Sequence, residues 1–381
     1  MGRHPGLRVL QLASFTSSFD RVMIAPLLVV IADEFGLSVA DVTTAATVHL
    51  VGYGAMQLVW GLLSDRLGRV RMMRLALFVA AVASVLGAAS GSLSALIAAR
   101  AVAGATFAAV IPGALVYIGD TVPLRERQGP MTDLMRGTAV GAAAATVGAG
   151  VLVDVASWRL PFLAVGIAAA ALAVALHGLP EPAARATPGV RAPLAAVVRS
   201  RWALLVLSLA LGEGFVMLAV LNFVPAALQE SEGMSATAAG AVVALYGVGA
   251  LVAAPLVKRL SVWVPRSRLI AAGGLTAALS LCAFPVGPGL VAMLIGCAGL
   301  GCGWAFMHSS LQTWATDVVP HARAVTVSLF ATVLFLGNSV GTLVGGRLLA
   351  VSRFQNIFLG FALLGVPVVV AAMWGSRRYE R

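Results

Sequence analysis

Ionisable side chains in the middle of long apolar runs are the residues of this sequence best suited to chemistry. Asp20 and Arg21 lie within one such run, and Glu213 lies within another, between Gly212 and Gly214. A charge at the centre of a membrane span costs about 2.5–3.5 kcal/mol on insertion scales, so such residues are usually functional. We expect Asp20 and Glu213 to carry protons and Arg21 to contact a substrate. The alternative is structural: Asp20 and Arg21 would pair with neighbouring helices, and Glu213 would stay neutral, bonded to a backbone carbonyl.

A second set of polar residues lies within the apolar runs at helical spacing. Trp304, His308 and Gln312 follow one another at intervals of four, which places them on one face of a helix. Histidine titrates near neutral pH, so this face could give a substrate cavity a titratable group. The alternative is a packed aromatic residue and a core histidine with satisfied hydrogen bonds. Asn222 and Asn338 could bond a substrate or neighbouring helices. Weaker candidates are His49 and Gln57.

The elements that must position these residues are hydrophobic spans. Of the 381 residues, 60% are hydrophobic and 11% are charged, and the mean hydropathy is +0.96, far more apolar than a soluble domain. A helix of about 20 apolar residues crosses a bilayer. We therefore predict an all-α membrane protein with twelve transmembrane helices, at residues 8–32, 42–63, 72–90, 94–117, 131–153, 160–179, 202–228, 236–257, 267–285, 288–314, 323–347 and 354–375.

The positive charges indicate how these spans are oriented. Cytoplasmic loops are enriched in Lys and Arg. With both termini inside, the inner segments hold 21 of the 26 basic residues, and the outer loops hold three: Arg159, Arg347 and Arg353. This bias predicts cytoplasmic termini and assigns the net charge of +11 to membrane topology, not to nucleic-acid binding. The short loops and the single Lys favour a bacterial plasma (inner) membrane.

The loop between the second and third spans carries a dense charge cluster. It reads Gly61-Leu-Leu-Ser-Asp65-Arg66-Leu-Gly68-Arg69-Val-Arg71. This string resembles the loop 2–3 signature of the major facilitator superfamily of secondary transporters, with the second basic residue displaced to Arg71. The resemblance implies a cytoplasmic gate in which Asp65 and Arg69 contact Asp120 and the amino end of span 11 in the outward-facing state. The other gate residues that it implies are Gly61, Arg66 and Gly68.

Three further stretches carry the same resemblance. Leu96-x-x-x-Arg100-x-x-x-Gly104 is similar to the family's span-4 arginine motif. Pro26 with residues 31–36 resembles the end of span 1 in the twelve-span drug–proton antiporters, and Trp158-Arg-x-x-Phe162 is common at the start of span 6. By this resemblance Arg100 aids proton transfer or binds an anionic group. The alternative is an arginine that extends outward to the membrane surface.

One stretch departs from the antiporter pattern. The span-5 motif of the antiporters normally contains a Gly-Pro-x-x-Gly core, whereas this chain has Ala144-Ala145-Thr-Val-Gly148. The span remains rich in Gly and Ala, which permits close helix packing. The missing proline weakens the case for antiport.

An internal duplication divides the chain. At an offset of 197 residues, Gly36-Leu-Ser38 matches Gly233-Met-Ser235, Arg69-Val-Arg71 matches Arg266-Ser-Arg268, Gly104 matches Gly301, and Asp120-Thr-Val-Pro123 matches Asp317-Val-Val-Pro320. We predict two pseudo-symmetric six-helix bundles, 1–179 and 202–381, joined by a cytoplasmic linker at 180–201, with the substrate site between them. Asp65 corresponds to Val262, so the acidic gate motif is present in the first half alone.

The sequence favours transport over the other functions considered. A cavity with few charges suits proton-coupled export of lipophilic or cationic small molecules. An uptake carrier or facilitator for a small metabolite, such as a sugar or organic anion, is the alternative, because Arg100 or Arg21 could bind an anion. An enzyme would need clustered catalytic residues, and the sequence has no HExxH, GxSxG or phosphate-binding glycine loop. We therefore expect a monomeric, non-enzymatic protein without cofactor or metal, whose partners are a small-molecule substrate, protons and the lipid bilayer.

Overall fold

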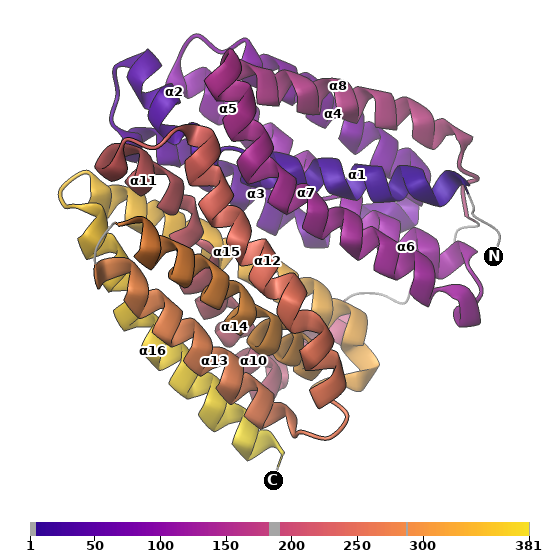
Figure 1. Cartoon of the computed structure of the whole chain (residues 1–381). Helices are drawn as coiled ribbons and strands as arrows, with labels where there is room; N and C mark the ends of the chain where they lie inside the picture. The colour runs from indigo at the N-terminus through magenta and orange to yellow at the C-terminus, as the bar shows by residue number, and fades with distance from the viewer. Residues whose placement is uncertain (1–4, 183–190, 287–288, 381) are drawn as a thin grey trace.

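The chain folds into two groups of long helices (Figure 1). The computed structural model describes residues 5–182, 191–286 and 289–380, apart from the side chains of residues 5, 62, 65, 66 and 124. The first group contains α1 (Pro5–Val22), η1 (Ala25–Leu27), α2 (Leu28–Phe35), α3 (Val39–Leu67), α4 (Arg69–Ala88), α5 (Leu93–Phe107), α6 (Val110–Thr121), η2 (Leu124–Glu126), α7 (Gln128–Val155), α8 (Arg159–Ala175) and η3 (Leu176–Gly178).

The second group follows a short helix, α9 (Arg191–Arg199), that lies within the predicted linker. Val197 of α9 is buried with Ala203, Val319 and Ala322. The other elements are α10 (Arg201–Glu213), η4 (Gly214–Leu218), η5 (Val220–Asn222), α11 (Val224–Glu232), α12 (Ala236–Leu260), α13 (Arg266–Ala283), η6 (Phe284–Val286), α14 (Leu290–Asp317), η7 (Pro320–Ala322), α15 (Arg323–Leu349) and α16 (Phe354–Tyr379).

Eleven helical segments in the described part of the chain are long and apolar enough to cross a membrane. They coincide with eleven of the twelve predicted spans, which confirms an all-helical, multi-pass membrane protein. The remaining prediction, at 42–63, coincides with α3, a helix of 29 residues that is not among the eleven. A twelfth span therefore stays a prediction.

Three of the predicted spans are interrupted by prolines. The first is broken at η1, which contains Pro26, and the fourth is broken between α5 and α6, which has Pro112 as its third residue. The seventh passes from α10 through a π-helical turn, η4, and a 3₁₀ turn, η5, into α11, which begins Val224-Pro225. Proline lacks a backbone N–H and clashes with the preceding turn, which favours a break in the helix, although α12 and α16 continue through Pro255 and Pro367. These breaks place irregular backbone beside Asp20 and Glu213.

The same turn occurs once in each group of helices. Gly36 ends α2 with φ of 64°, and Gly233 ends α11 with φ of 63°. A left-handed glycine is the usual residue after a helix carboxyl end. Two residues later, Ser38 and Ser235 accept a hydrogen bond from the backbone of the next helix, α3 or α12. The duplicated Gly-x-Ser pattern of the sequence thus has a structural counterpart in each group.

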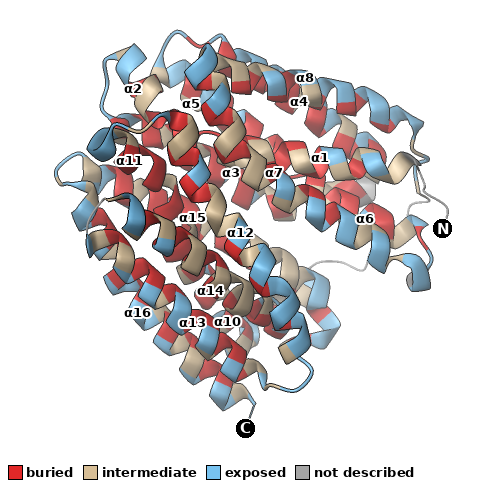
Figure 2. Cartoon of the chain, viewed as in Figure 1, coloured by how far each residue is buried: buried red, intermediate tan, exposed pale blue. Residues whose placement is uncertain are grey.

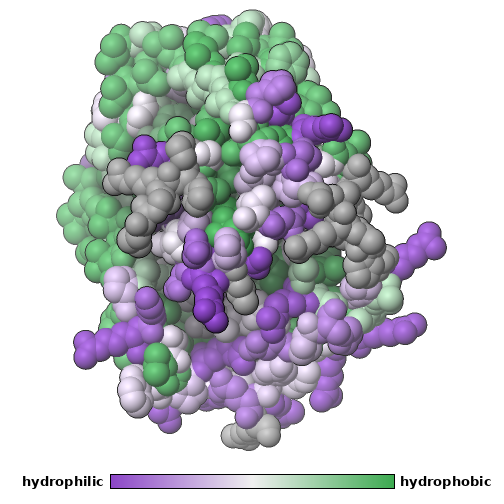
Figure 3. Space-filling model, turned by 90° about the vertical axis from the view of Figure 1, so that its right-hand side faces the viewer, coloured by the Kyte–Doolittle hydropathy of each residue, from purple (hydrophilic) through white to green (hydrophobic). Residues whose placement is uncertain are grey.

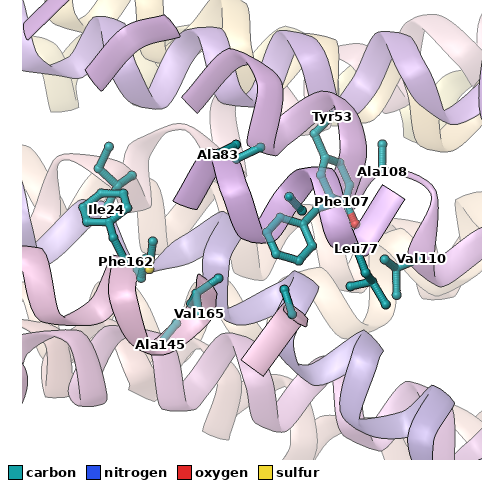
Figure 4. Packing of buried hydrophobic residues seen from close by; sticks show 14 of the residues in the cluster. Ile24, Tyr53, Leu77, Ala83, Phe107, Ala108, Val110, Ala145, Phe162 and Val165 are labelled. Carbon is teal, nitrogen blue, oxygen red and sulfur yellow. The ribbon is translucent and has the colours of Figure 1, made fainter. Parts of the chain in front are cut away.

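Each group of helices has its own buried apolar core. One core extends over α1 to α8 and includes Ala226, Ala236 and Phe335 of the facing group, and the other extends over α10 to α16. Figure 4 shows part of the first, where Tyr53 and Phe107 lie near Leu77 and Val110. Buried residues occupy the facing sides of the helices, and exposed residues occupy their outer sides (Figure 2). Large apolar residues such as Phe78 and Leu279 are exposed on the outside, as expected for a surface covered by lipid.

The two groups of helices meet at one end and diverge at the other (Figure 1). We call the end that carries both chain termini the proximal end and the opposite end the distal end. Hydrophilic side chains gather on the side that carries the N-terminus, and hydrophobic side chains cover the part above them (Figure 3). At the distal end Gln229 of α11 donates to the Pro26 carbonyl at 3.2 Å, which joins the two groups.

Two helix pairs form most of the interface between the groups. In the pair of α3 and α15, Ser339 donates to the Thr47 carbonyl at 3.1 Å. In the pair of α7 and α12, the Asp154 carboxylate accepts from the backbone N–H groups of Ala236 at 3.2 Å and Thr237 at 2.9 Å. The described contacts lie in the distal and central parts of these helices. The structure is therefore closed at the distal end.

Candidate functional site

A buried ion pair lies within the first group of helices. Nη1 of Arg100, on α5, donates to Oδ1 of Asp20, on α1, at 2.7 Å, and Nη2 donates to the Asp20 carbonyl at 3.0 Å. Both side chains are at most 1% exposed. Arg100 therefore points inward to Asp20 and does not extend outward to the membrane surface.

His49, on α3, completes this cluster. Its Nδ1 lies 3.6 Å from Oδ2 of Asp20, and its side chain is 1% exposed. Within the described residues, neither His49 nitrogen nor Oδ2 of Asp20 has a hydrogen-bond partner. One carboxylate oxygen is thus held by an arginine, and the other faces a titratable imidazole. One proton could therefore bind to Oδ2 of Asp20 or to the His49 imidazole while Arg100 keeps Oδ1 of Asp20 as its partner.

Arg21 extends away from Asp20, toward the interface between the two groups. Its guanidinium carbon lies 5.4 Å from the ring centre of Tyr53 and 4.8 Å from that of Phe335, on α15. Adjacent helical residues diverge by about 100°, so the two charges of this dipeptide have different neighbours. Arg21 is therefore the cation that reaches the second group of helices.

A second buried carboxylate lies within the second group of helices. Glu213, at the end of α10, is fully buried, and its Oε2 lies 3.0 Å from Nδ1 of His308, on α14. The His308 ring stacks on Trp304 with ring centres 4.0 Å apart. Glu213 is followed directly by the π-helical turn of η4, and such turns are frequent at functional sites. The structure thus brings three predicted site residues together.

The predicted residues Asn222 and Asn338 also contact each other, whereas Gln312, the third residue on the face of α14 that carries Trp304 and His308, does not join Glu213. Nδ2 of Asn222 donates to Oδ1 of Asn338 at 3.2 Å and to the Thr342 hydroxyl at 2.8 Å. Gln312 is exposed. The two asparagines therefore bond each other across η5 and α15, and a substrate would have to compete with these bonds.

The predicted gate region forms a network at the proximal end. Nε of Arg69 lies 2.5 Å from Oδ2 of Asp120, and Nη1 of Arg69 donates to the Ser64 hydroxyl at 2.8 Å. The Glu181 carboxylate accepts from the N–H groups of Val70 and Arg71 at 3.0 Å each, which satisfies free donors at the start of α4. The side chains of Asp65 and Arg66 lie outside the described residues. At the remaining gate positions, Gly61 borders open space and Gly68 has φ of 91°.

The second group of helices repeats this network. Arg266 donates to the Asp317 carboxylate at 2.8 Å, and these residues lie 197 positions after Arg69 and Asp120. The Glu380 carboxylate accepts from the N–H and the hydroxyl of Ser267, at 3.0 and 2.5 Å. Two carboxylates that the sequence analysis did not single out, Glu181 and Glu380, thus cap equivalent helices. Both follow the last helix of their half, and this position is the signal that could have identified them.

A cavity of about 780 Å³ lies within the second group of helices. It is bounded by α12, α13 and α14 and extends from Trp304 and His308 to the charged residues at the proximal end: Lys258, Arg266, Asp317 and Glu380. Apolar walls come from Ala250, Ala254 and Leu269. A volume of this size suits a small organic molecule. No group of three or more residues that could hold a metal ion occurs among the described residues.

Comparison with known proteins gives the family. The model of the Major Facilitator Superfamily matches residues 10–342. The rubrofusarin-specific efflux pump aurT of Gibberella zeae is 31% identical over 169 residues, which cover 43% of this chain and 30% of that protein. The inner membrane transport protein YnfM of Escherichia coli is 26% identical over 151 residues, 40% of this chain and 36% of that protein. The chain thus matches only about a third of the length of these relatives.

Solved structures share the fold over the whole chain. A bacterial homologue of the human lysosomal transporter Spinster, in an inward-facing and unoccupied conformation, has a TM-score of 0.82 at 18% identity and covers 99% of this chain and 98% of its own. A D-xylose–proton symporter has a TM-score of 0.79 at 16% identity, with 97% and 96% covered. At such low identity the likeness concerns the fold alone.

Proposed function

Because this chain belongs to the major facilitator superfamily of membrane transporters, we propose that it couples proton entry to the export of lipophilic or cationic small molecules by alternating access. The observation that carries the proposal is the buried Asp20–Arg100 pair with an unbonded Asp20 oxygen facing His49. Removing an ion pair from water costs free energy, so a buried pair of this kind is a candidate for a functional role. A proton that arrives at Asp20 would neutralise the carboxylate and weaken its bond to Arg100.

Glu213 and Asp20 are the two proton carriers of this proposal. They lie in different halves, 1–179 and 202–381, which the linker 180–201 connects. Each carboxylate has one oxygen bonded and one oxygen, Oδ2 of Asp20 or Oε1 of Glu213, without a partner among the described atoms. Each also has a histidine beside it. A proton can therefore be accepted in either half.

Alternating access would proceed by rocking of the two six-helix bundles. We take α3 as the twelfth span and the proximal end as cytoplasmic, since the loops there hold the excess of basic residues. The distal contacts of Asp154, Gln229 and Ser339 would then close the outer side. The networks of Arg69 and Arg266 would form the inner gate when the proximal ends approach each other.

The substrate would bind between and beside these proton carriers. The residues proposed to contact it are Arg21, Asn222, Trp304, His308, Gln312 and Asn338, a set with little charge. The chain would act as a monomer in the inner membrane of a bacterium, with protons and the bilayer as its other partners. The efflux activity named for the Gibberella pump supports export.

Uptake of a small metabolite is the second candidate function. Arg21 supports it, because this cation reaches the interface between the halves and no acidic partner is described for it. A sugar or organic anion could bond to it there. The fold is shared with a D-xylose–proton symporter, which is compatible with this alternative.

Transport by purified protein in liposomes tests both candidates. With an interior more acidic than the medium, an antiporter accumulates lipophilic cations, so the panel contains cationic and neutral drugs together with D-xylose and an organic anion. We expect wild type to accumulate cations and Asp20→Asn and Glu213→Gln to lose gradient-driven flux. Asp133→Asn, at an exposed acid on α7, is the control. Flux that depends neither on the pH gradient nor on the two substitutions would refute proton coupling.

A further inference from the structure

His308 connects the buried Glu213 carboxylate to the cavity of the second group of helices. His308 lines the cavity and is 17% exposed, whereas Glu213 lies behind it and is fully buried. Nδ1 of His308 faces Oε2 of Glu213 at 3.0 Å, so the imidazole N–H donates to the carboxylate. A carboxylate partner of this kind fixes the tautomer of the ring. Nε2 is then the nitrogen that remains for a ligand in the cavity.

The charged residues that line the cavity have no net charge, so the Glu213–His308 pair determines the sign of the charge there. Four charged residues line its proximal end, and their charges cancel: Lys258, Arg266, Asp317 and Glu380. Two of the four bond each other at 2.8 Å, and Glu380 bonds Ser267. From the other half, the cation Arg21 lies over Tyr53 and Phe335 and is not among the residues that line the cavity. With a neutral imidazole, the Glu213–His308 pair therefore carries one negative charge beside the cavity.

Aromatic rings surround the imidazole on several sides. Trp304 stacks on His308 with an interplanar angle of 11°, and Phe330 lies 5.5 Å from the imidazole centre. Tyr246, on α12, meets Trp304 edge-on with ring centres 6.2 Å apart. Aromatic faces attract cations, and most strongly where water is excluded. A negative pair beside aromatic rings is the chemistry that recognises a flat organic cation.

We propose that Glu213, His308 and Trp304 form a binding site for a planar organic cation with an N–H donor, and that a proton competes with this ligand for His308. With neutral imidazole, Nε2 accepts the ligand N–H while Glu213 supplies the opposite charge. With a proton on Nε2, the pair is neutral and Nε2 becomes a donor, so the cation leaves. The inference deepens the proposed function by assigning the cationic substrate to the second half and to one pair of side chains.

Ethidium binding to the purified protein in detergent tests this site. Ethidium is a flat cation with two aromatic amino groups, and its fluorescence anisotropy reports binding between pH 5.5 and 8.5. We expect wild-type affinity to rise with pH, because a proton on His308 opposes the bound cation. Glu213→Gln should bind about tenfold to a hundredfold more weakly at pH 8. His308→Gln, which keeps an acceptor, should bind with an affinity that no longer changes with pH.

Controls separate this site from a folding defect and from the proposed function. Asp133→Asn, an exposed acid on α7, should bind ethidium as wild type does, and circular dichroism should show folded variants throughout. Wild-type-like binding by both Glu213→Gln and His308→Gln overturns the site, as does the absence of ethidium binding by wild type. If the site behaves as expected but liposomes show no gradient-driven flux, the site stands and proton-coupled export fails.

Discussion

Removal of the Asp154 carboxylate should shift the protein toward opening at the distal end. Asp154 accepts from two N–H groups in the first turn of α12, and this contact crosses between the halves. A carboxylate at a helix amino end contributes about 0.3–1 kcal/mol, and a lost N-cap costs about 0.5–2 kcal/mol. Asp154 is exposed, and solvent screens such contacts, so we expect about 1 kcal/mol for Asp154→Ala. This corresponds to a roughly fivefold change in the ratio of distally closed to distally open protein.

Distances between spin labels on the two halves measure this ratio. Gly91→Cys and Val351→Cys, both exposed at the distal end, carry the labels in a background without Cys282, Cys297 and Cys302. The long-distance population should grow about fivefold in Asp154→Ala and less in Asp154→Asn, which keeps one acceptor. Asp133→Ala is the control, since the Asp133 ion pair lies within α7. Unchanged distances in Asp154→Ala would refute the argument that this contact holds the distal end closed.

Three other substitutions test packing and helix ends. Gly214→Ala places a methyl group against a backbone carbonyl oxygen of α15 and should cost about 1–3 kcal/mol, whereas Gly360→Ala, with open space around it, should not lower the melting temperature. Arg100→Ala leaves the buried Asp20 carboxylate without its partner and should cost about 3–5 kcal/mol in thermal unfolding. Glu181→Ala frees two N–H groups at the start of α4 and should cost about 1 kcal/mol, read as faster hydrogen exchange in that turn.

Each of these three predictions has a result that would contradict it. Equal melting temperatures of Gly214→Ala and wild type would mean that η4 and α15 can separate without strain. Arg100→Ala as stable as wild type would mean that Asp20 is neutral in the folded protein. If protection from hydrogen exchange in the first turn of α4 is unchanged in Glu181→Ala, other acceptors must cap this helix.

The helices were predictable because the apolar runs are long and their ends carry local signals. Gly36 and Ser38 show in the sequence where one helix ends and the next begins, and the structure uses both. The interruptions were not predicted as breaks, although Pro26 and Pro225 were visible, because apolar composition continues through them. α9 was also missed, since its pairing of Val197 with Val319 joins segments that are distant in the chain.

The candidate site was predictable residue by residue but not as a set of contacts. Asp20 and Glu213 stood out because a charge is costly in an apolar run. Their partners depend on how helices pack together: His49, on α3, meets Asp20, on α1, and His308 meets Glu213 across α10 and α14. Spacing within one helix carries no information on such crossings, so His49 ranked low in the sequence and lies at the centre of the cluster in the structure.

Several glycines at the interface between the halves touch the backbone of the facing helix. Gly54 faces the Thr332 carbonyl, Gly150 faces the Ala236 carbonyl, and Gly240 faces that of Thr146. Where a glycine meets backbone along these seams, the helices can part without any rotamer change, which lowers the activation barrier to separation. The same seams tolerate no added methyl group. If the halves rock as proposed, we expect Gly150→Ala, which would place a methyl group against the backbone of Ala236 and Thr237, to slow transport while leaving Asp20 and Glu213 untouched.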